Sequence, residues 1–361
     1  MSDKCVSRAS STECLPAVRP RGVVGIRWQG SVVGECLSVR PELSGQGCRA
    51  RRLVPYRSRN VFRDILCALA IMWMLLSMPL GSTRLCAQPT SEKPKASANA
   101  AAKFRFQGGI VYTRSGKVDL KLDAYIPNAE GLHPVVLVVH GGAWASGSRR
   151  QLAFYAMKLA RSGFCCFAID YRLAPKYKFP AQIEDCRAAV RWIRKHAAEY
   201  SGDASRLGAI GYSAGGHLVA LLGTTGTPGD AAGKVDTRLQ CVVAGGAPCE
   251  FRHMPDKGRR LAFWLGGTMD EVAQNFRNAT PVVFASKDDP PMMFFNGTQD
   301  RLVPLKWTMP LFESLRSKGV PVQMHQIKGA GHMAAAANAE ALTAAVSFLK
   351  QHLQPGKQRA Q

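Results

Sequence analysis

The chain has 361 residues, of which 46% are hydrophobic and 20% charged, so it is long and apolar enough for one large globular domain or two small ones. Its net charge of +23 would suit a nucleic acid, but the basic residues are spread along the sequence. No RRM, zinc-finger or helix-turn-helix pattern accompanies them, which argues against a nucleic-acid partner and favours a solvated basic surface.

The N-terminal segments precede the folded part. Residues 1–60 are rich in arginine and cysteine and lack periodicity, so they stay unassigned; one interpretation places them upstream of the true translation start. Residues 65–80 form an uncharged apolar run after a cluster of arginines, short for a membrane span but suited to a secretory signal over residues 61–87. An uncleaved signal anchor is the alternative. Residues 88–103 have the composition of a linker.

A single α/β domain is predicted over residues 104–352, with a tail over residues 353–361. Residues 104–127 alternate apolar and polar side chains about a Ser-Gly turn, which predicts an antiparallel hairpin. Buried-strand and helical patterns then alternate, which is typical of a mainly parallel sheet with helices on both faces. Later strands are expected at 133–140, 164–171, 206–212, 240–248, 290–297 and 321–329, and helices at 150–163, 180–200, 214–223, 305–319 and 338–353.

The stretch GYSAG, residues 211–215, lies between a predicted strand and a predicted helix. It matches G-x-S-x-G, a turn so tight that the flanking positions need minimal side chains and the serine hydroxyl is exposed above the sheet. An ordinary helix N-cap also fits a short Gly/Ser turn. Whether Ser213 is a nucleophile therefore depends on the residues that follow it.

A base and an orienting acid both occur after strand ends, where active residues gather in parallel sheets. His332 lies in the glycine-rich loop GAGHM after the last strand, whereas His325 lies within that strand. Asp300 follows the strand at 290–297 and precedes His332. The order Ser, Asp, His is that of α/β-hydrolases, so we predict Ser213 as nucleophile, His332 as general base and Asp300 as its partner.

The stretch HGGAW, residues 140–144, directly follows the first buried strand. Backbone N–H groups approach an oxyanion closely only where side chains are small, so Gly142 and Ala143, together with Ala214, are the predicted oxyanion donors. His140 is interpreted as a structural brace of this loop.

Three aromatic residues are weaker candidates for substrate contact: Trp144, Tyr212 and Trp264. Trp144 could instead pack within its loop. Trp264 lies in a charged, turn-rich insertion from about Glu250 to Pro281, and with Phe263 it could simply anchor that insertion. The short apolar cluster there is a poor lipase lid, so a short acyl pocket is expected.

The cysteines do not predict a disulfide framework. Of the eleven cysteines, six lie at or before the predicted cleavage site. The odd number that remains predicts mostly free, buried thiols. They are Cys165, Cys166, Cys186, Cys241 and Cys249.

The motifs HGGAW, DYRLAP, FPAQIEDCRAAVRWIR, GYSAGGHL, NGTQDRLVP and GAGH resemble those of hormone-sensitive-lipase-like esterases with the α/β-hydrolase fold. The resemblance covers about residues 105–352 and is strongest to the bacterial branch named for a feruloyl and acetyl-xylan esterase domain (BD-FAE). It implies cofactor-free hydrolysis of carboxylic esters, with Ser213, Asp300 and His332 as the triad. It also implies structural roles for Asp170, Tyr171, Arg172 and Asp185.

Two features depart from that group. No helical cap is evident before the strand at 133–140, and Met333 stands where an aromatic residue is expected.

The expected function is that of an exported serine carboxylesterase, periplasmic or extracellular, acting on short-chain esters such as acetyl or feruloyl esters of carbohydrates. A cleaved signal would leave it without a stable membrane partner, and the sequence does not fix its oligomeric state. Two alternatives remain open at this point: an arylformamidase-type amidase, and a non-catalytic binding module on the same fold.

Overall fold

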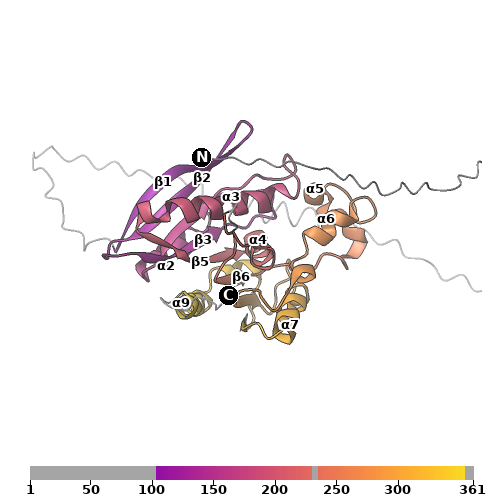
Figure 1. Cartoon of the computed structure of the whole chain (residues 1–361). Coiled ribbons are helices and arrows are strands. Elements are labelled where there is room, and N and C mark those ends of the chain that lie inside the picture. The colour runs from indigo at the N-terminus through magenta and orange to yellow at the C-terminus, as the bar shows by residue number, and fades with distance from the viewer. Residues whose placement is uncertain (1–102, 230–234, 354–361) are drawn as a thin grey trace, which may run out of the picture. The chain divides into compact units, whose positions relative to one another are not determined.

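We describe the protein from a computed structural model, which covers residues 103–229 and 235–353. The unassigned segment 1–60, the predicted signal segment, the linker up to residue 102 and residues 354–361 of the predicted tail lie outside these described residues. Eight strands form one sheet in the order β1-β2-β4-β3-β5-β6-β7-β8 (Figure 1). They are β1 (Phe104–Ser115), β2 (Val118–Pro127), β3 (His133–Val139), β4 (Cys165–Ile169), β5 (Gly202–Tyr212), β6 (Cys241–Gly245), β7 (Met292–Gly297) and β8 (Val322–Ile327).

The first two strands form the predicted hairpin. β1 pairs antiparallel with β2, and β2 pairs antiparallel with β4. Gly116 occupies the turn with φ +59°, a left-handed conformation that glycine adopts without steric cost. The remaining pairs, from β4 through β3 and β5 to β8, are all parallel. The mainly parallel sheet with an N-terminal antiparallel hairpin is therefore confirmed.

Two layers of helices cover the sheet because the helices bury apolar side chains against it; α4 is buried on all sides. α2 and α9 pack on one face, with Tyr155 and Phe348 in the core. α3, α4 and α7 pack on the other, with Ile183, Leu218 and Leu311 in the core. The long helices are α2 (Ala153–Arg161), α3 (Ala181–His196), α4 (Ala214–Thr224), α7 (Met309–Ser317) and α9 (Ala339–His352).

Short helices and 3-10 turns complete the chain. The insertion contains η2 (Pro255–Leu261), α5 (Ala262–Leu265), α6 (Ala273–Asn278) and the start of η3 (Pro281–Phe284). The others are η1 (Ala197–Tyr200), η4 (Leu305–Trp307) and α8 (His332–Ala336). Within the described residues, no helix is both long and apolar enough to span a bilayer.

Four functional segments follow strands whose carboxyl ends lie at one edge of the sheet. Residues 140–144 follow β3, Ser213 follows β5, Asp300 follows β7 and His332 follows β8. Because β3 and β5 are paired neighbours, the loop after β3 lies directly beside Ser213. The topology thus gathers the predicted site residues along that edge.

Buried ion pairs brace the loops at this edge. The Arg172 guanidinium donates to both carboxylate oxygens of Asp185, with the shortest contact at 2.7 Å. Arg149 lies 2.6 Å from an oxygen of Asp170 and 2.7 Å from one of Asp123. These contacts agree with structural roles for Asp170, Arg172 and Asp185. The five cysteines of the described chain are free and buried, as predicted.

Candidate active site

Glycines at the turn after β5 allow three backbone segments to meet at Ser213. A Cβ on Gly211 would lie 2.3 Å from the carbonyl oxygen of Gly215, and one on Gly215 would lie 2.0 Å from that of Val139. A Cβ on Gly216 would lie 2.4 Å from the carbonyl oxygen of Gly245. Since backbone atoms cannot move aside as a flexible side chain can, these positions accept glycine alone.

Ser213 itself is strained, with φ +58° and ψ −122°. A serine at positive φ costs about 1–2 kcal/mol, and such strain clusters at functional sites. Its N–H donates to the carbonyl of Gly245 at 2.8 Å. Its hydroxyl makes no hydrogen bond to another described residue, so it is free to turn toward a base or a substrate carbonyl.

The peptide between Gly141 and Gly142 is oriented by two buried side chains. The carbonyl of Gly141 accepts from His140 Nδ1 at 2.7 Å and from the Tyr171 hydroxyl at 3.3 Å. In a trans peptide the N–H points opposite to the carbonyl, so holding this carbonyl aims the Gly142 N–H the other way. A Cβ on Gly141 would lie 3.3 Å from Ser213 Cβ, which places the peptide against the serine.

The next peptide is oriented in the same manner. The carbonyl of Gly142 accepts from the N–H groups of Ala145 and Ser146, both at 3.0 Å. The Ala143 N–H belongs to the same peptide as this carbonyl, so it points the opposite way, away from the hydrogen bonds within the loop. Neither this N–H nor that of Gly142 donates to an acceptor among the described residues. Ala214 begins α4, where helical N–H groups lack intrahelical partners, and it adds a third donor beside Ser213.

Asp300 and His332 form a close pair. His332 Nδ1 lies 2.6 Å from Asp300 Oδ2, and the Asp300 side chain is fully buried. Asp300 Oδ1 accepts from the N–H groups of Leu302 and Val303, at 3.0 and 2.8 Å. Because both carboxylate oxygens are engaged, the carboxylate is fixed and holds the His332 proton on Nδ1. Nε2 is left as the basic nitrogen.

Tyr212 holds the start of α8, whose first residue is His332; the sequence pattern predicts His332 in the glycine-rich loop before this helix. Its hydroxyl donates to the His332 carbonyl at 2.6 Å, and burial raises the pKa of Tyr212, so it remains a donor. A Cβ on Gly246 would lie 3.1 Å from His332 Cε1, and the preceding Gly245 accepts from the Ser213 N–H. His332 therefore lies beside the segment that is bonded to Ser213.

The three weaker candidates prove to be buried residues with structural partners. Tyr212 is 4% exposed, Trp144 5% and Trp264 0%. Trp144 and Trp264 stack on each other with ring centroids 3.6 Å apart. These placements leave substrate contact by Tyr212 a prediction, and its hydroxyl is already bonded to the His332 carbonyl. They favour the packing alternative for Trp144 and the anchoring alternative for Trp264.

One residue of the site region was missed by sequence reasoning. His217, four positions after Ser213 on α4, is fully buried and bonds both to Trp144 and to the carbonyl of Ala279. The available signal was a histidine in the otherwise apolar stretch AGGHLVALLG, where a polar ring must find partners. His140 behaves as expected, as a brace stacked on Tyr171 with ring centroids 4.1 Å apart.

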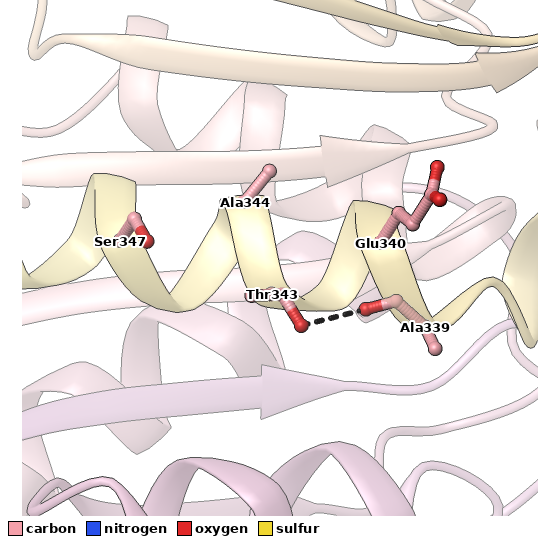
Figure 2. A pocket seen from close by; sticks show the side chains of 5 residues that line it. All are labelled: Ala339, Glu340, Thr343, Ala344 and Ser347. Carbon is pink, nitrogen blue, oxygen red and sulfur yellow. Dashed lines mark hydrogen bonds between the residues drawn. The ribbon is translucent and has the colours of Figure 1, made fainter.

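Within the described ranges, no group of His, Cys, Asp and Glu side chains could hold a metal ion. A shallow hollow on the surface of α9 is lined by small residues and one carboxylate (Figure 2). It shares no residue with the site around Ser213, and we assign it no function. Its lining is Ala339, Glu340, Thr343, Ala344 and Ser347.

Comparison with known proteins identifies the family of the chain. The family model BD-FAE matches residues 122–315, which include Ser213, Asp300 and residues 140–144, here called the oxyanion loop. The chain belongs to the BD-FAE family. Esterase LipC of Mycobacterium tuberculosis is 32% identical to it over 211 residues, or 55% of this chain and 52% of LipC. The chain thus spans about half the length of the curated relatives it matches.

Solved structures show the same architecture. A truncated form of carbohydrate esterase from gut microbiota aligns with a TM-score of 0.63 at 24% identity, covering 70% of this chain and 98% of that chain. Esterase Est2 of the planctomycete Thermogutta terrifontis, solved with propionate bound, aligns with a TM-score of 0.59 at 26% identity, covering 70% and 96%. The α/β-hydrolase fold of this BD-FAE member is therefore confirmed.

Proposed function

We propose that this protein is a serine carboxylesterase that cleaves short-chain esters through an acyl-enzyme on Ser213. The observation that carries the proposal is the surroundings of this serine. Its hydroxyl has no hydrogen-bond partner among the described residues, the Gly141–Gly142 peptide packs against it, and His332, paired with Asp300, lies beside the segment bonded to its N–H. Membership of the BD-FAE family and the esterase relatives support the same reaction.

In the first half-reaction, His332 Nε2 takes the Ser213 proton while Oγ attacks the ester carbonyl carbon. The carbonyl oxygen becomes an oxyanion that accepts hydrogen bonds from the N–H groups of Gly142, Ala143 and Ala214. One such donor typically lowers the barrier by about 3 kcal/mol. As the tetrahedral intermediate collapses, the C–O bond to the alcohol breaks and the imidazolium of His332 protonates the departing alkoxide.

In the second half-reaction, water replaces the alcohol. His332 removes a proton from water as its oxygen attacks the acyl carbon, and the same three N–H groups bind the new oxyanion. Collapse releases the carboxylic acid, and the proton returns from His332 to Ser213 Oγ. Throughout, the buried Asp300 carboxylate stabilises the imidazolium through the 2.6 Å contact at Nδ1.

The nucleophile is tested by Ser213→Ala with p-nitrophenyl acetate as substrate. The expected result is a loss of kcat of about 10³-fold or more with an unchanged circular dichroism spectrum. Ser162→Ala is a suitable control, because Ser162 is a half-buried residue whose hydroxyl bonds only to the Lys158 carbonyl at the end of α2. More than a few per cent of wild-type activity in Ser213→Ala would remove Ser213 as nucleophile. A higher kcat/KM on N-formylkynurenine than on any ester would favour the amidase alternative.

Short acyl groups are proposed from the insertion. Trp264 and Leu265 of its apolar cluster are fully buried. Phe263, 37% exposed, is the only exposed large apolar side chain of the insertion. Such a surface does not shelter a long chain or meet a lipid phase. The propionate-bound Est2 relative also supports a short acyl site. We expect acetyl to butyryl p-nitrophenyl esters to be preferred, with kcat/KM about tenfold lower by octanoyl; a preference for decanoyl esters would contradict this.

Acetylated or feruloylated carbohydrates are the proposed natural substrates, supported by the family match and by the carbohydrate esterase among the structural neighbours. Release of acetate or ferulate from xylan tests this. Export is proposed from the apolar run at residues 65–80. N-terminal sequencing of the native protein should find a chain that begins near Gln88. A peptide from residues 1–60 detected in whole cells would show that these residues are translated and would exclude a translation start after them.

A further inference from the structure

Two residues of the oxyanion loop have a strained backbone conformation. Ala143 and Trp144 have φ +51° and φ +58°, two successive non-glycine residues in the left-handed region. Each costs about 1–2 kcal/mol, and for a bulky residue such as Trp144 this conformation is a clear outlier. Strain of this kind persists where surrounding contacts hold it, so the contacts of Trp144 identify what maintains the loop.

Residues far away in the sequence hold the Trp144 ring. It stacks on Trp264 of the insertion at 3.6 Å with the ring planes parallel. Its Nε1 donates to His217 Nδ1 on α4 at 3.1 Å, and Phe251 meets it edge-on at 6.0 Å. The Trp144 carbonyl also accepts from the Ala174 N–H at 2.9 Å. The ring is thus fixed on one side by the helix behind the nucleophile and on the other by the insertion.

The side chain of His217 bonds both to the oxyanion loop and to the insertion. An indole N–H only donates, so His217 Nδ1 must be the acceptor from Trp144 and its proton must lie on Nε2. Nε2 then donates to the carbonyl of Ala279 in the insertion at 2.7 Å. Burial lowers the pKa of His217 to about 4, which keeps this neutral tautomer at ordinary pH. One imidazole therefore ties the oxyanion loop to the insertion.

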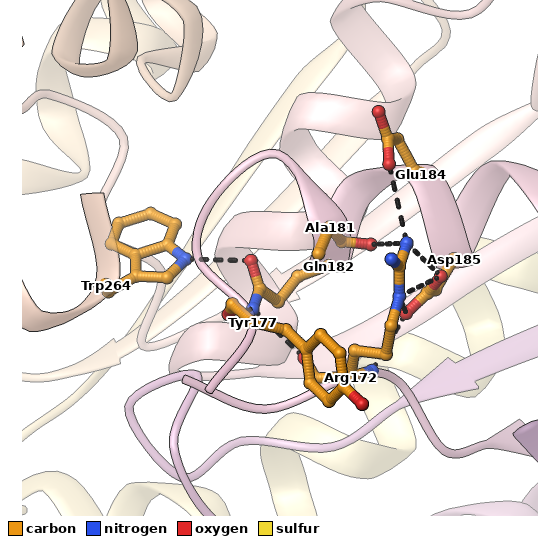
Figure 3. Close-up of polar contacts among 7 residues, drawn as sticks. All are labelled: Arg172, Tyr177, Ala181, Gln182, Glu184, Asp185 and Trp264. Carbon is orange, nitrogen blue, oxygen red and sulfur yellow. Dashed lines mark hydrogen bonds and ion pairs between the residues drawn. The ribbon is translucent and has the colours of Figure 1, made fainter. Parts of the chain in front are cut away.

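Trp264 is in turn firmly anchored to the body of the domain. Its Nε1 donates to Gln182 Oε1 at 3.1 Å, and its carbonyl accepts from the Phe179 N–H at 2.9 Å. Gln182 donates onward to the carbonyls of Arg172 and Tyr177 (Figure 3). With no exposed surface, Trp264 has nothing to offer a substrate, and its contacts are those of a fixed support.

We propose that the insertion from Glu250 to Pro281 is a positioning element rather than a lid. Through Trp264 and Ala279 it holds Trp144, and so keeps residues 140–144 in the strained conformation that leaves the N–H groups of Gly142 and Ala143 free for the oxyanion. The inference rests on the proposed esterase reaction. It makes Trp264 and His217 positioning residues for transition-state stabilisation, although neither contacts the substrate.

The test pairs two adjacent insertion residues. In Trp264→Leu the stack is lost, so kcat on p-nitrophenyl acetate should fall about tenfold with KM within about twofold, because misplacing donors costs less than deleting one. Trp264→Phe keeps an aromatic ring and should recover most of that loss. Phe263→Leu, next to it and 37% exposed, should leave both constants near wild type. A raised KM with unchanged kcat in Trp264→Leu would instead assign the residue to substrate binding and overturn the proposal.

Hydrogen exchange supplies a readout that does not need activity. The N–H groups of Ala145 and Ser146 are bonded within the loop, so their exchange should accelerate in Trp264→Leu but not in Phe263→Leu. Should Trp264→Leu fail to fold, His217→Asn provides the same test, since asparagine cannot reach the Ala279 carbonyl. Wild-type exchange and wild-type kcat in the folded variant would overturn the proposal. If exchange in the loop accelerates in Trp264→Leu but the wild-type protein has no esterase activity, the positioning role of the insertion stands and the proposed esterase reaction is refuted.

Discussion

The two arms that meet at Ser213 differ in where their chemistry lies. In the acid–base arm, Asp300 and His332, the reacting groups are side chains joined by a 2.6 Å contact. In the proposed oxyanion arm, residues 140–144, the groups assigned to stabilise charge are backbone N–H groups, and the contacts around them orient two peptides. A side-chain substitution can therefore delete the first kind of group, whereas any replacement other than proline keeps the backbone N–H and can only misplace it.

The two arms also differ in the charge of their side chains. The acid–base arm keeps a buried carboxylate next to an imidazole that must accept a proton. The oxyanion arm is supported by two histidines, His140 and His217, that stay neutral because burial lowers the pKa of each to about 4. The four predictions below test this comparison, from the largest expected effect to the smallest.

The largest effect is expected for Asp300→Asn. The N–H groups of Leu302 and Val303 both donate to Oδ1, so the asparagine oxygen should face them and its NH₂ should face His332. That NH₂ would donate to His332 Nδ1 and drive the imidazole proton to Nε2, where the base must be free. We expect kcat to fall about 10³ to 10⁴-fold with the fold retained. A loss below about tenfold in steady-state assays would show that Asp300 does not set the tautomer.

Acid should destabilise the oxyanion arm. Between pH 6.5 and about 4 the unfolded chain protonates His140 and His217 whereas the folded chain does not, so stability falls as the pH falls. Each histidine should lower the free energy of unfolding by about 2 kcal/mol between pH 7 and pH 5. Urea denaturation of wild type and His217→Asn at both pH values measures this. The variant should show the shallower dependence, and an unchanged one would contradict a neutral buried His217.

Tyr171→Phe should misplace a donor without removing it. The hydroxyl donates to the carbonyls of His140 and Gly141, at 3.1 and 3.3 Å, and without it only His140 Nδ1 orients the Gly141 peptide. We expect kcat about tenfold lower with KM nearly unchanged, in line with the loss of about one buried hydrogen bond. A changed KM with wild-type kcat would place Tyr171 in substrate binding instead.

Tyr212→Phe is the matched change in the acid–base arm and should have the smallest effect. Its hydroxyl also donates to a backbone carbonyl, that of His332 at 2.6 Å, but the imidazole keeps its contact with Asp300. A loss of about threefold in kcat is expected. If Tyr212→Phe costs more than Tyr171→Phe in the same assay, the acid–base arm is the more weakly supported of the two.

Much of the site could be predicted because its chemistry depends on residue identity. Ser213, Asp300 and His332 each follow a strand that has a clear apolar pattern, and parallel strands bring their carboxyl ends together. The glycines at 211 and 215 could be predicted too, since any Cβ there meets backbone within 2.3 Å. The alternation of strand and helix patterns predicted the mainly parallel sheet, and the alternation of apolar and polar residues about a Ser-Gly turn predicted the N-terminal hairpin.

The remainder depends on contacts between residues distant in sequence. Stacking of Trp144 on Trp264 joins positions 120 residues apart, and no local pattern indicates it. Likewise, the sequence does not show that the hydroxyls of Tyr212 and Tyr171 donate to backbone carbonyls on other segments of the site. Helix α8, five residues long, is too short for a periodic signal, and β5 begins at Gly202 before the apolar run that predicted it.

Covalent labelling tests the central claim most directly, because only an activated serine reacts with a fluorophosphonate. The probe is added to the full chain, and the labelled protein is digested and its peptides identified by mass spectrometry. The proposed reaction predicts one adduct per chain, on Ser213, with labelling lost in Ser213→Ala and slowed in Asp300→Asn. An adduct on any other residue, or ester hydrolysis by a protein that Ser213 labelling does not inactivate, would contradict it.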